Sequence, residues 1–175
     1  MHVPGEKDTN GSPRRKGMTL IELLVVIAIV SILAAAVMPL SRMTVRRVKE
    51  AELRNALRTI RTALDSFNRD CTTADVKKKL ATDNCDGDKE NWPEKLEVLT
   101  EPLKLAGTGD RTRKYLRRIP SDPFTPLESA DQPNNWGLRS YKDDPDSTQW
   151  GGQNVYDVYS KSEGIALDGT KYSTW

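Results

Sequence analysis

The sequence has almost no histidine and no motif of a nucleophilic or nucleotide-binding enzyme. Of the 175 residues, only His2 is a histidine, and no G-x-S-x-G, P-loop or dinucleotide fingerprint occurs. Chemistry that needs an imidazole is therefore excluded from nearly the whole chain. Asp143, Asp144 and Asp146 surround a proline, and we interpret them as a solvated turn rather than a catalytic pair. We expect a protein that is not an enzyme.

The chain also lacks a strong excess of charge. The formal net charge is +2, and the mean hydropathy is −0.63. Residues 41–70 hold eight bases and four acids, whereas residues 71–175 hold fifteen bases and eighteen acids. Neither balance reaches the level typical of nucleic-acid-binding domains, and the basic run at 111–118 is interpreted as a solvated edge. We expect no nucleic-acid partner.

Cysteine is scarce, and the two present leave two alternatives. Cys71 and Cys85 would stay thiols in a cytosolic protein. In an exported protein they could form a disulfide, closing a short loop worth roughly 3 kcal/mol. Their spacing does not fit C-x-x-C chemistry, and no histidine lies nearby to complete a zinc site.

What the sequence does contain is one long apolar run, residues 18–40, after a polar stretch, 1–17, that ends in three bases and a glycine. About 20 apolar residues span the hydrocarbon core of a bilayer, which predicts a signal-anchor helix. The bases before the run fit a cytoplasmic flank, but Arg42, Arg46 and Arg47 follow it, so charge counting alone leaves the orientation open. A cleaved signal peptide with an A-x-A pattern at 34–36 is the alternative. Glu22 counts against the cleaved signal peptide. A charge inside the run is costly, so Glu22 either reaches toward water or meets a cation.

An amphipathic pattern follows this run without a loop. Apolar residues recur at steps of three and four from Val45 to Phe67, which predicts one helix from about Thr19 to Asn68. The stem, 41–70, should bury this stripe against a sheet. Its basic face is either solvated or a contact with the acidic domain of a neighbouring subunit. Pro39 predicts a kink or local unwinding of the helix.

Residues 71–112 are predicted to hold an insertion, 71–92, and a second helical segment. Thr73 can cap a short helix over 74–81. Pro93 suits the first turn of another helix. The apolar side of that helix comprises Leu96, Leu99 and Leu103.

Residues 113–175 are rich in turns and short strands. Apolar and polar residues alternate at 134–141 and 154–160, which predicts two antiparallel strands with a loop between them. The tail, 161–175, is predicted as a loop and a short last strand. The fold class is α+β: a long N-terminal helix packed on a small antiparallel sheet, with a loop-rich C-terminal region.

The stretch "RRKGMTLIELLVVIAIVSILAAAVMP" resembles the prepilin signature of type IV pilins and type II secretion pseudopilins. In that superfamily a prepilin peptidase cuts after a glycine and the new N-terminal residue is methylated. The matching positions are Gly17, Met18, Glu22 and Pro39, although the family usually has Phe where this chain has Met18. The resemblance implies that Glu22 pairs with the N-terminal cation of a neighbouring subunit and sets the register of assembly.

The C-terminal part resembles the major, G-type pseudopilin. The stretches "KYLRRIPSDPFTP" and "NVYDVYSKSEG", followed by a terminal Trp, carry this resemblance. The matching residues are Tyr115, Arg117, Arg118, Pro120, Asp122, Pro123, Phe124, Tyr159, Ser160, Glu163 and Gly164.

The resemblance implies a single-pass inner-membrane protein whose C-terminal domain lies in the periplasm. Its partners would be further copies in a helical filament, a prepilin peptidase, other pseudopilins, the inner-membrane secretion platform and lipid. A type IV pilin for adhesion or motility is the alternative. A membrane-anchored periplasmic binding domain differs in class, and it predicts a pocket and an uncut or Ala-cut N-terminus.

The family's acidic C-terminal loop binds a structural Ca²⁺. That ion takes six to eight oxygen ligands, normally with several carboxylates. The matching loop here offers Glu163 and Asp168 as charged ligands, with Ser162, Lys161 and backbone carbonyls as further candidates. It is poorer in acids than the family's loop, so we favour a loop closed by hydrogen bonds alone. No other cofactor is expected.

Overall fold

A computed structural model describes residues 17–74, 80–81, 85–107, 109–124 and 135–175, without the side chains of 36–41. The chain divides into an N-terminal unit, Met1–Met43, and a head unit, Thr44–Trp175, and each is described by itself. The element order is α1 (Leu20–Thr72), η1 (Gly87–Lys89), η2 (Leu96–Thr100), β1 (Leu103–Lys104), β2 (Thr112–Arg113), β3 (Trp136–Arg139), β4 (Asp157–Ser160) and η4 (Tyr172–Thr174). The α+β class is confirmed. The polar stretch 1–17, a cleaved prepilin leader by the resemblance, lies almost wholly outside the described residues.

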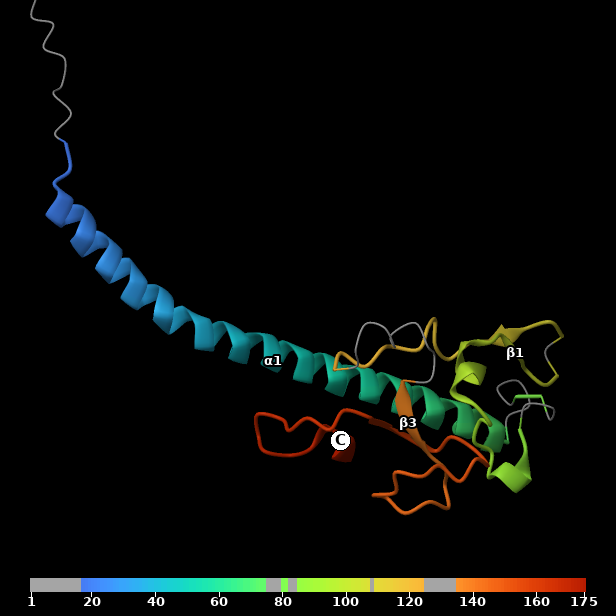
Figure 1. The fold of residues 1–175 in the computed structure, drawn as a ribbon. Helices are drawn as coiled ribbons and strands as arrows, with labels where there is room; N and C mark the ends of the chain where they lie inside the picture. The colour runs from blue at the N-terminus through green and yellow to red at the C-terminus, as the bar shows by residue number, and fades with distance from the viewer. Residues whose placement is uncertain (1–16, 75–79, 82–84, 108, 125–134) are drawn as a thin grey trace, which may run out of the picture. The chain divides into compact units, whose positions relative to one another are not determined.

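Helix α1 confirms the predicted long helix and extends it by about one turn at its C-terminal end (Figure 1). Its helical assignment runs through Pro39 without a break, so the predicted local unwinding is wrong. A proline removes one backbone hydrogen bond, and the bonds on either side keep the backbone helical. The predicted kink stays a prediction.

The second part of α1 carries the core of the head unit. Its buried positions follow helical spacing and are Leu53, Ala56, Leu57, Ile60, Ala63, Leu64, Phe67 and Cys71. The predicted inclusion of Val45 and Val48 in this stripe is wrong, because they are 55% and 53% exposed. Counting back from Leu53 by helical steps reaches Glu50 and Arg46, so the inward positions there are polar.

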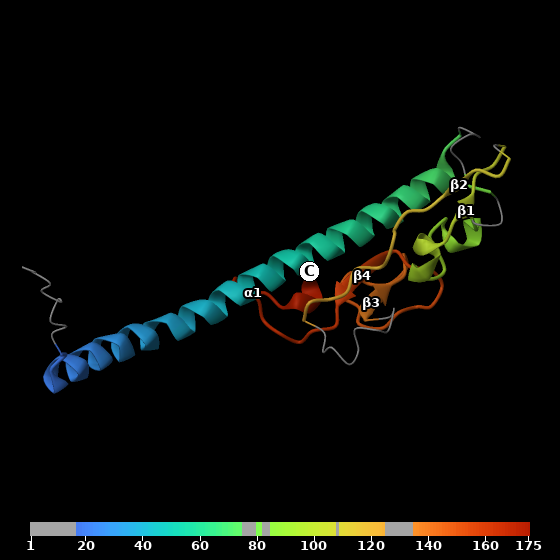
Figure 2. The ribbon, with the colours of Figure 1, turned by 90° about the horizontal axis from the view of Figure 1, so that it is seen from above.

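Two small antiparallel sheets pack beside α1 (Figure 2). Strands β3 and β4 pair with Gly137 opposite Tyr159 and confirm the predicted strand pair. Strands β1 and β2 form a second pair that the sequence did not predict, with Leu103 opposite Arg113. Two-residue strands give no periodicity to detect, which explains the miss.

Gly137 is needed at its position because a side chain opposite fills the space above it. A methyl group on Gly137 would overlap the ring of Tyr159. That ring in turn stacks under the guanidinium of Arg139, 4.2 Å from the ring centroid. Glycine therefore lets a tyrosine lie flat across the sheet.

The segment after α1 is held by a disulfide between Cys71 and Cys85, so the bonded alternative is confirmed. The helix expected over 74–81 lies mostly outside the described residues. Its end at Leu80 is not helical, because Leu80 pairs with Leu105 in an antiparallel bridge. The bridge to Leu105 and the full burial of the Leu80 side chain outweigh the local helix propensity of this segment.

Two other predicted short elements form a different type of secondary structure from the one expected. The segment after Pro93 is the five-residue 3₁₀ helix η2, not a longer helix. All three predicted leucines are nonetheless buried, Leu103 from strand β1. The predicted last strand is a single bridge, Ile165 to Lys171, followed by η4. Burial of Tyr172 in the core ends the extended backbone there.

Candidate functional site

The predicted processing site lies just before α1 on exposed backbone. Gly17 and Met18 are non-helical, and Met18 is 68% exposed. Apart from its chain neighbours, no described residue lies within 4 Å of where a side chain on Gly17 would stand. A peptidase that binds extended substrate could reach this bond without unfolding any described element. Cleavage and methylation at this position stay predictions.

Glu22 lies in the first turn of α1, where it has a local role that the sequence analysis missed. Its backbone N–H donates to Thr19 Oγ1 at 3.3 Å, so Thr19 caps the helix. A threonine followed three residues later by glutamate is the capping-box pattern, and the negative charge favours the helix N-terminus. "TLIE" therefore starts the helix and places the Glu22 carboxylate within one turn of Met18.

The large apolar side chains at the start of α1 are left uncovered within the described N-terminal unit. From Leu20 to Leu33 the large apolar side chains are between 47% and 77% exposed. The one hydroxyl among them, Ser31, donates back to the carbonyl of Ile27 at 2.7 Å, which satisfies it within the helix. Such a surface is normally covered by lipid or by other helices.

Within the residues that the structure describes, no helical stretch has the length and hydropathy of a membrane span. The side chains of 36–41, which end the predicted 18–40 segment, lie outside those residues. The transmembrane assignment stays a prediction.

A polar cluster fixes the C-terminal segment on α1. Glu50, 8% exposed, accepts hydrogen bonds from the backbone N–H of Leu167 at 2.8 Å and the hydroxyl of Tyr172 at 2.9 Å. Arg46 donates to the same hydroxyl at 3.3 Å and lies 3.6 Å from Glu50. Burial and the bond to Glu50 raise the pKa of Tyr172, while Arg46 opposes them. One oxygen of the buried carboxylate, Oε1, thus takes all of these contacts.

Two further arginines of α1 hold the same segment. Arg61 binds Asp157 at 2.6 Å and donates to the carbonyls of Val158 at 3.0 Å and Trp175 at 2.7 Å. Arg54 meets Asp168 at 3.2 Å, and its guanidinium lies 4.2 Å from the ring centroid of Trp175. Part of the predicted basic face is therefore an internal clamp rather than a solvated surface.

The candidate calcium loop is closed by these contacts and does not fit the ion. Asp168 Oδ1 accepts from the backbone and hydroxyl of Thr170 at 2.9 and 2.6 Å, and Oδ2 faces Arg54. The bonds from Thr170 hold the pKa of Asp168 below its usual range. Ser162 Oγ accepts from the backbone N–H of Gly164.

Glu163 and Lys161 are exposed in the same loop. The described residues contain no group of three or more acidic, histidine or cysteine side chains able to hold a metal. Ca²⁺ needs several carboxylates, and both oxygens of Asp168 are already engaged. Hydrogen bonds and an arginine close this loop.

The residues of the C-terminal resemblance join a loop to the sheet. Asp122, 3% exposed, accepts from Ser160 Oγ at 2.5 Å and from the backbone N–H of Phe124 at 2.8 Å. Phe124 stacks on Tyr172 with ring centroids 4.1 Å apart. Their role in this fold is structural, since each polar atom named is satisfied inside the head unit.

Other candidate polar clusters are also structural. Asp143 accepts backbone hydrogen bonds from Ser140 at 2.7 Å and Gly151 at 3.0 Å, so it closes a turn. Burial raises its pKa and these bonds outweigh that effect, leaving the pKa lowered. Asp70 accepts from Tyr115 and pairs with Arg113, both at 2.7 Å, which ties the end of α1 to β2.

Comparison with known proteins identifies the N-terminal segment. Residues 12–38 match the family model described as the prokaryotic N-terminal methylation motif. No curated protein and no solved structure matches the chain. The match covers Gly17, Met18 and Glu22 and the apolar helix that follows them.

The match and the helix that follows it point to one class of protein. The chain carries the N-terminal cleavage and methylation motif of type IV pilin-like proteins at the start of a long helix. Proteins of this kind are structural and not enzymes. The motif implies an inner-membrane prepilin with a periplasmic C-terminal domain, processed by a prepilin peptidase and assembled into a filament.

Proposed function

We propose that the chain is the subunit of a periplasmic pseudopilus that helps to export folded proteins by type II secretion. A prepilin peptidase cuts after Gly17 on the cytoplasmic side of the inner membrane and methylates Met18. The observation that carries the filament is the run of exposed apolar side chains from Leu20 to Leu33 directly behind this junction. An apolar helix that its own chain leaves uncovered needs lipid before assembly and neighbouring helices after it.

The assignment to secretion rests on the C-terminal resemblance. The Asp-Pro-Phe segment and the Tyr-Ser end of β4 lie together in the head unit, joined by the bond from Ser160 to Asp122. This supports one structural element rather than two chance matches in sequence. A type IV pilin would use the same N-terminal helix, and a long surface pilus that depends on this subunit would favour it.

The charge on Glu22 gains its partner only after cleavage. Removal of the leader gives Met18 an α-ammonium group, and a carboxylate near it in a packed filament relieves the cost of burying both charges. The carboxylate lies in the first turn because Thr19 starts the helix there. We propose that this pair between neighbouring subunits fixes their axial register.

The first test is the N-terminal sequence and intact mass of the processed protein. A chain that begins at N-methylated Met18 supports the filament function. A chain that begins after the small-residue pattern at 34–36 would contradict it, because the assembly helix would be lost.

The second test separates the charge of Glu22 from its place in the helix cap. Glu22→Ala and Glu22→Gln should both be cleaved normally and fail to form filaments. Thr19→Ala is the matched control, because it removes the cap hydrogen bond, worth about 1 kcal/mol, and keeps the carboxylate. Thr19→Ala should still assemble. Equal loss of filaments in all three variants would assign the defect to the helix start and refute the ion pair.

A further inference from the structure

The head unit carries a basic groove beside α1. We use this name for the hollow between the exposed face of α1 and the segment 113–123. Its two adjoining parts, about 410 and 680 Å³, share Thr59. The bases that line it are Arg58, Arg113, Lys114 and Arg118. Among the residues that the structure describes, the smaller part has no acidic lining residue, and Glu52 is the one acid that lines the larger part.

Most of these bases have no charge partner inside the chain. Arg113 pairs with Asp70, but Arg58, Lys114 and Arg118 make no ion pair with any residue that the structure describes. Arg117, next to the groove, is exposed and equally unpaired within the same ranges. A groove in which positive charges outnumber negative ones attracts negatively charged groups.

The same unit carries an acidic loop, residues 141–150. The carboxylates of Asp144 and Asp146 are exposed and form no ion pair with a described residue. Two aromatic side chains flank them: Tyr141 is 54% exposed and Trp150 is 39% exposed. Acids beside exposed rings suit a guanidinium, which can bind a carboxylate and stack on a ring. Arg54 stacks in this way on Trp175 within the chain.

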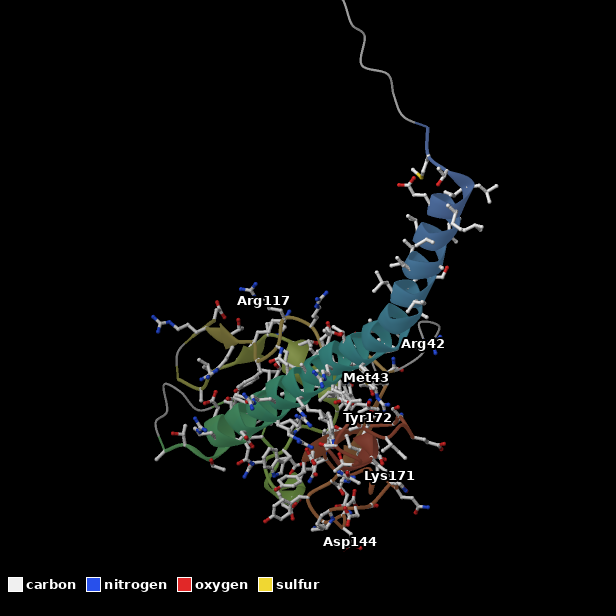
Figure 3. All side chains as sticks on the ribbon, turned by 90° about the vertical axis from the view of Figure 1, so that its left-hand side faces the viewer. Arg42, Met43, Arg117, Asp144, Lys171 and Tyr172 are labelled. Atoms are coloured by element: carbon white, nitrogen blue, oxygen red, sulfur yellow. A yellow bond between two sulfur atoms is a disulfide. The ribbon has the colours of Figure 1, made fainter. Side chains whose placement is uncertain are left out.

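The two surfaces lie on opposite sides of the head unit. Figure 3 shows Arg117 on one side of α1 and Asp144 on the other. One copy therefore cannot join its own groove to its own loop. Complementary patches on opposite sides make a heterologous contact, which repeats from copy to copy and forms an open filament where the rotation does not close a ring.

We propose that the basic groove of one copy binds the acidic loop of a second copy, head to tail. This inference rests on the proposed function, since it takes the filament as the assembly that brings the copies together. It adds a second contact, between head units, to the contact made by the apolar helices. The contact should weaken as salt rises, because its charges are exposed.

Cysteine cross-linking of the full-length protein in membranes tests the contact. Lys114→Cys with Asp144→Cys in one chain, treated with a short bismaleimide, should give a ladder of dimers, trimers and higher multimers. A mixture of the two single variants should give dimers only, and each single variant alone should give none. Dimers from one single variant alone would indicate an isologous contact and overturn the proposal.

The second experiment on this contact reverses the charge of the acidic loop. Because Asp144 is now substituted, the second cysteine is placed at Tyr141, and the cross-linking pair becomes Lys114→Cys with Tyr141→Cys. Adding Asp144→Lys and Asp146→Lys to this pair should reduce the ladder on the order of tenfold, because like charges would face each other. The control pair is Lys171→Cys with Asp144→Cys, since Lys171 lies on the same side as Asp144 in Figure 3. That pair should give no ladder.

The outcomes separate this inference from the proposed function. A missing ladder overturns the head-to-tail contact, whether or not filaments form. A processed N-terminus elsewhere than Met18 overturns the filament function, whatever the cross-links show. A ladder that survives charge reversal and high salt would mean that another surface joins the copies.

Discussion

Two parts of the same helix, α1, differ in what covers them. From Leu20 to Leu33 the large apolar side chains are exposed all round the helix. From Leu53 to Cys71 the apolar residues form one stripe, and that stripe is buried in the head unit. A helix with one apolar face finds its partner within the chain, whereas a helix that is apolar on every face needs a partner outside it. The contrast separates the folding part of α1 from its assembling part.

The largest expected effect comes from matched substitutions in the two parts. Ile60→Ala, at a fully buried site, should lower the free energy of unfolding by about 2–5 kcal/mol, which is a drop of roughly 10 °C in the unfolding midpoint. Ile27→Ala, where the side chain is 53% exposed, should leave that midpoint unchanged and reduce filament yield. Circular dichroism of the full chain in detergent measures the first effect and electron microscopy the second. Equal loss of head stability in both variants would break the distinction.

The disulfide at the C-terminal end of α1 offers a second test of how the buried part of the helix contributes to stability. Cys71→Ala with Cys85→Ala should cost roughly 3 kcal/mol of unfolding free energy, because the open chain gains entropy in the unfolded state. Removing both cysteines avoids a free thiol. Intact mass before and after reduction checks that the wild-type protein is bonded, and an unchanged urea midpoint in the variant would show that the bridge adds no stability.

The arginines of the stem divide into clamping and free residues. Arg61→Ala removes the bonds to Asp157, Val158 and Trp175 and should cost about 1–2 kcal/mol, an amount reduced by partial exposure of the pair. Arg58→Ala is the matched control and should change stability by less than about 0.5 kcal/mol. Thermal unfolding compares them. If Arg58→Ala proved as costly as Arg61→Ala, the assignment of Arg61 as a clamp would be wrong.

The smallest expected effect is a dependence on acid pH at Asp168. Hydrogen bonds from Thr170, with Arg54 in support, lower the pKa of Asp168 in the folded state. A lowered folded pKa gives stability that is present above the ordinary value of about 3.9 and is lost as pH falls through the folded value. Asp168→Asn should therefore be slightly less stable than wild type at pH 7. The two midpoints should converge in acid, and a constant gap from pH 7 to pH 2 would contradict this.

Periodic segments were predictable because each rests on a local rule. Steps of three and four predicted α1, and alternation of apolar and polar residues predicted β3 and β4. The short pieces were not predictable to the same degree. Whether Leu80 joins a helix or a bridge depends on Leu105, which is distant in sequence. The inward placement of Arg46 and Glu50 was also not predicted, because it depends on their contacts with Tyr172 and Leu167.

The candidate site was predictable where it is a linear motif. The junction at Gly17 and Met18 with Glu22 is encoded by neighbours in sequence, and the capping role of Thr19 could have been found from the same four residues. The calcium prediction depended on a loop whose ligands are set by folding. Arg54 reaches Asp168 from a distant part of the chain, and no local pattern shows that.

By itself the sequence determined the apolar assembly helix, its processing motif and the α+β class, because periodicity and motif spacing are local properties of the chain. Only the tertiary structure showed that Cys71 and Cys85 are bonded, and that Arg54 and Arg61 hold the C-terminal segment. It also placed a basic groove, most of whose bases form no ion pair with a described residue, and an acidic loop on opposite sides of the head. These features depend on which distant residues the packed core brings together, and that is set by burial and not by sequence spacing.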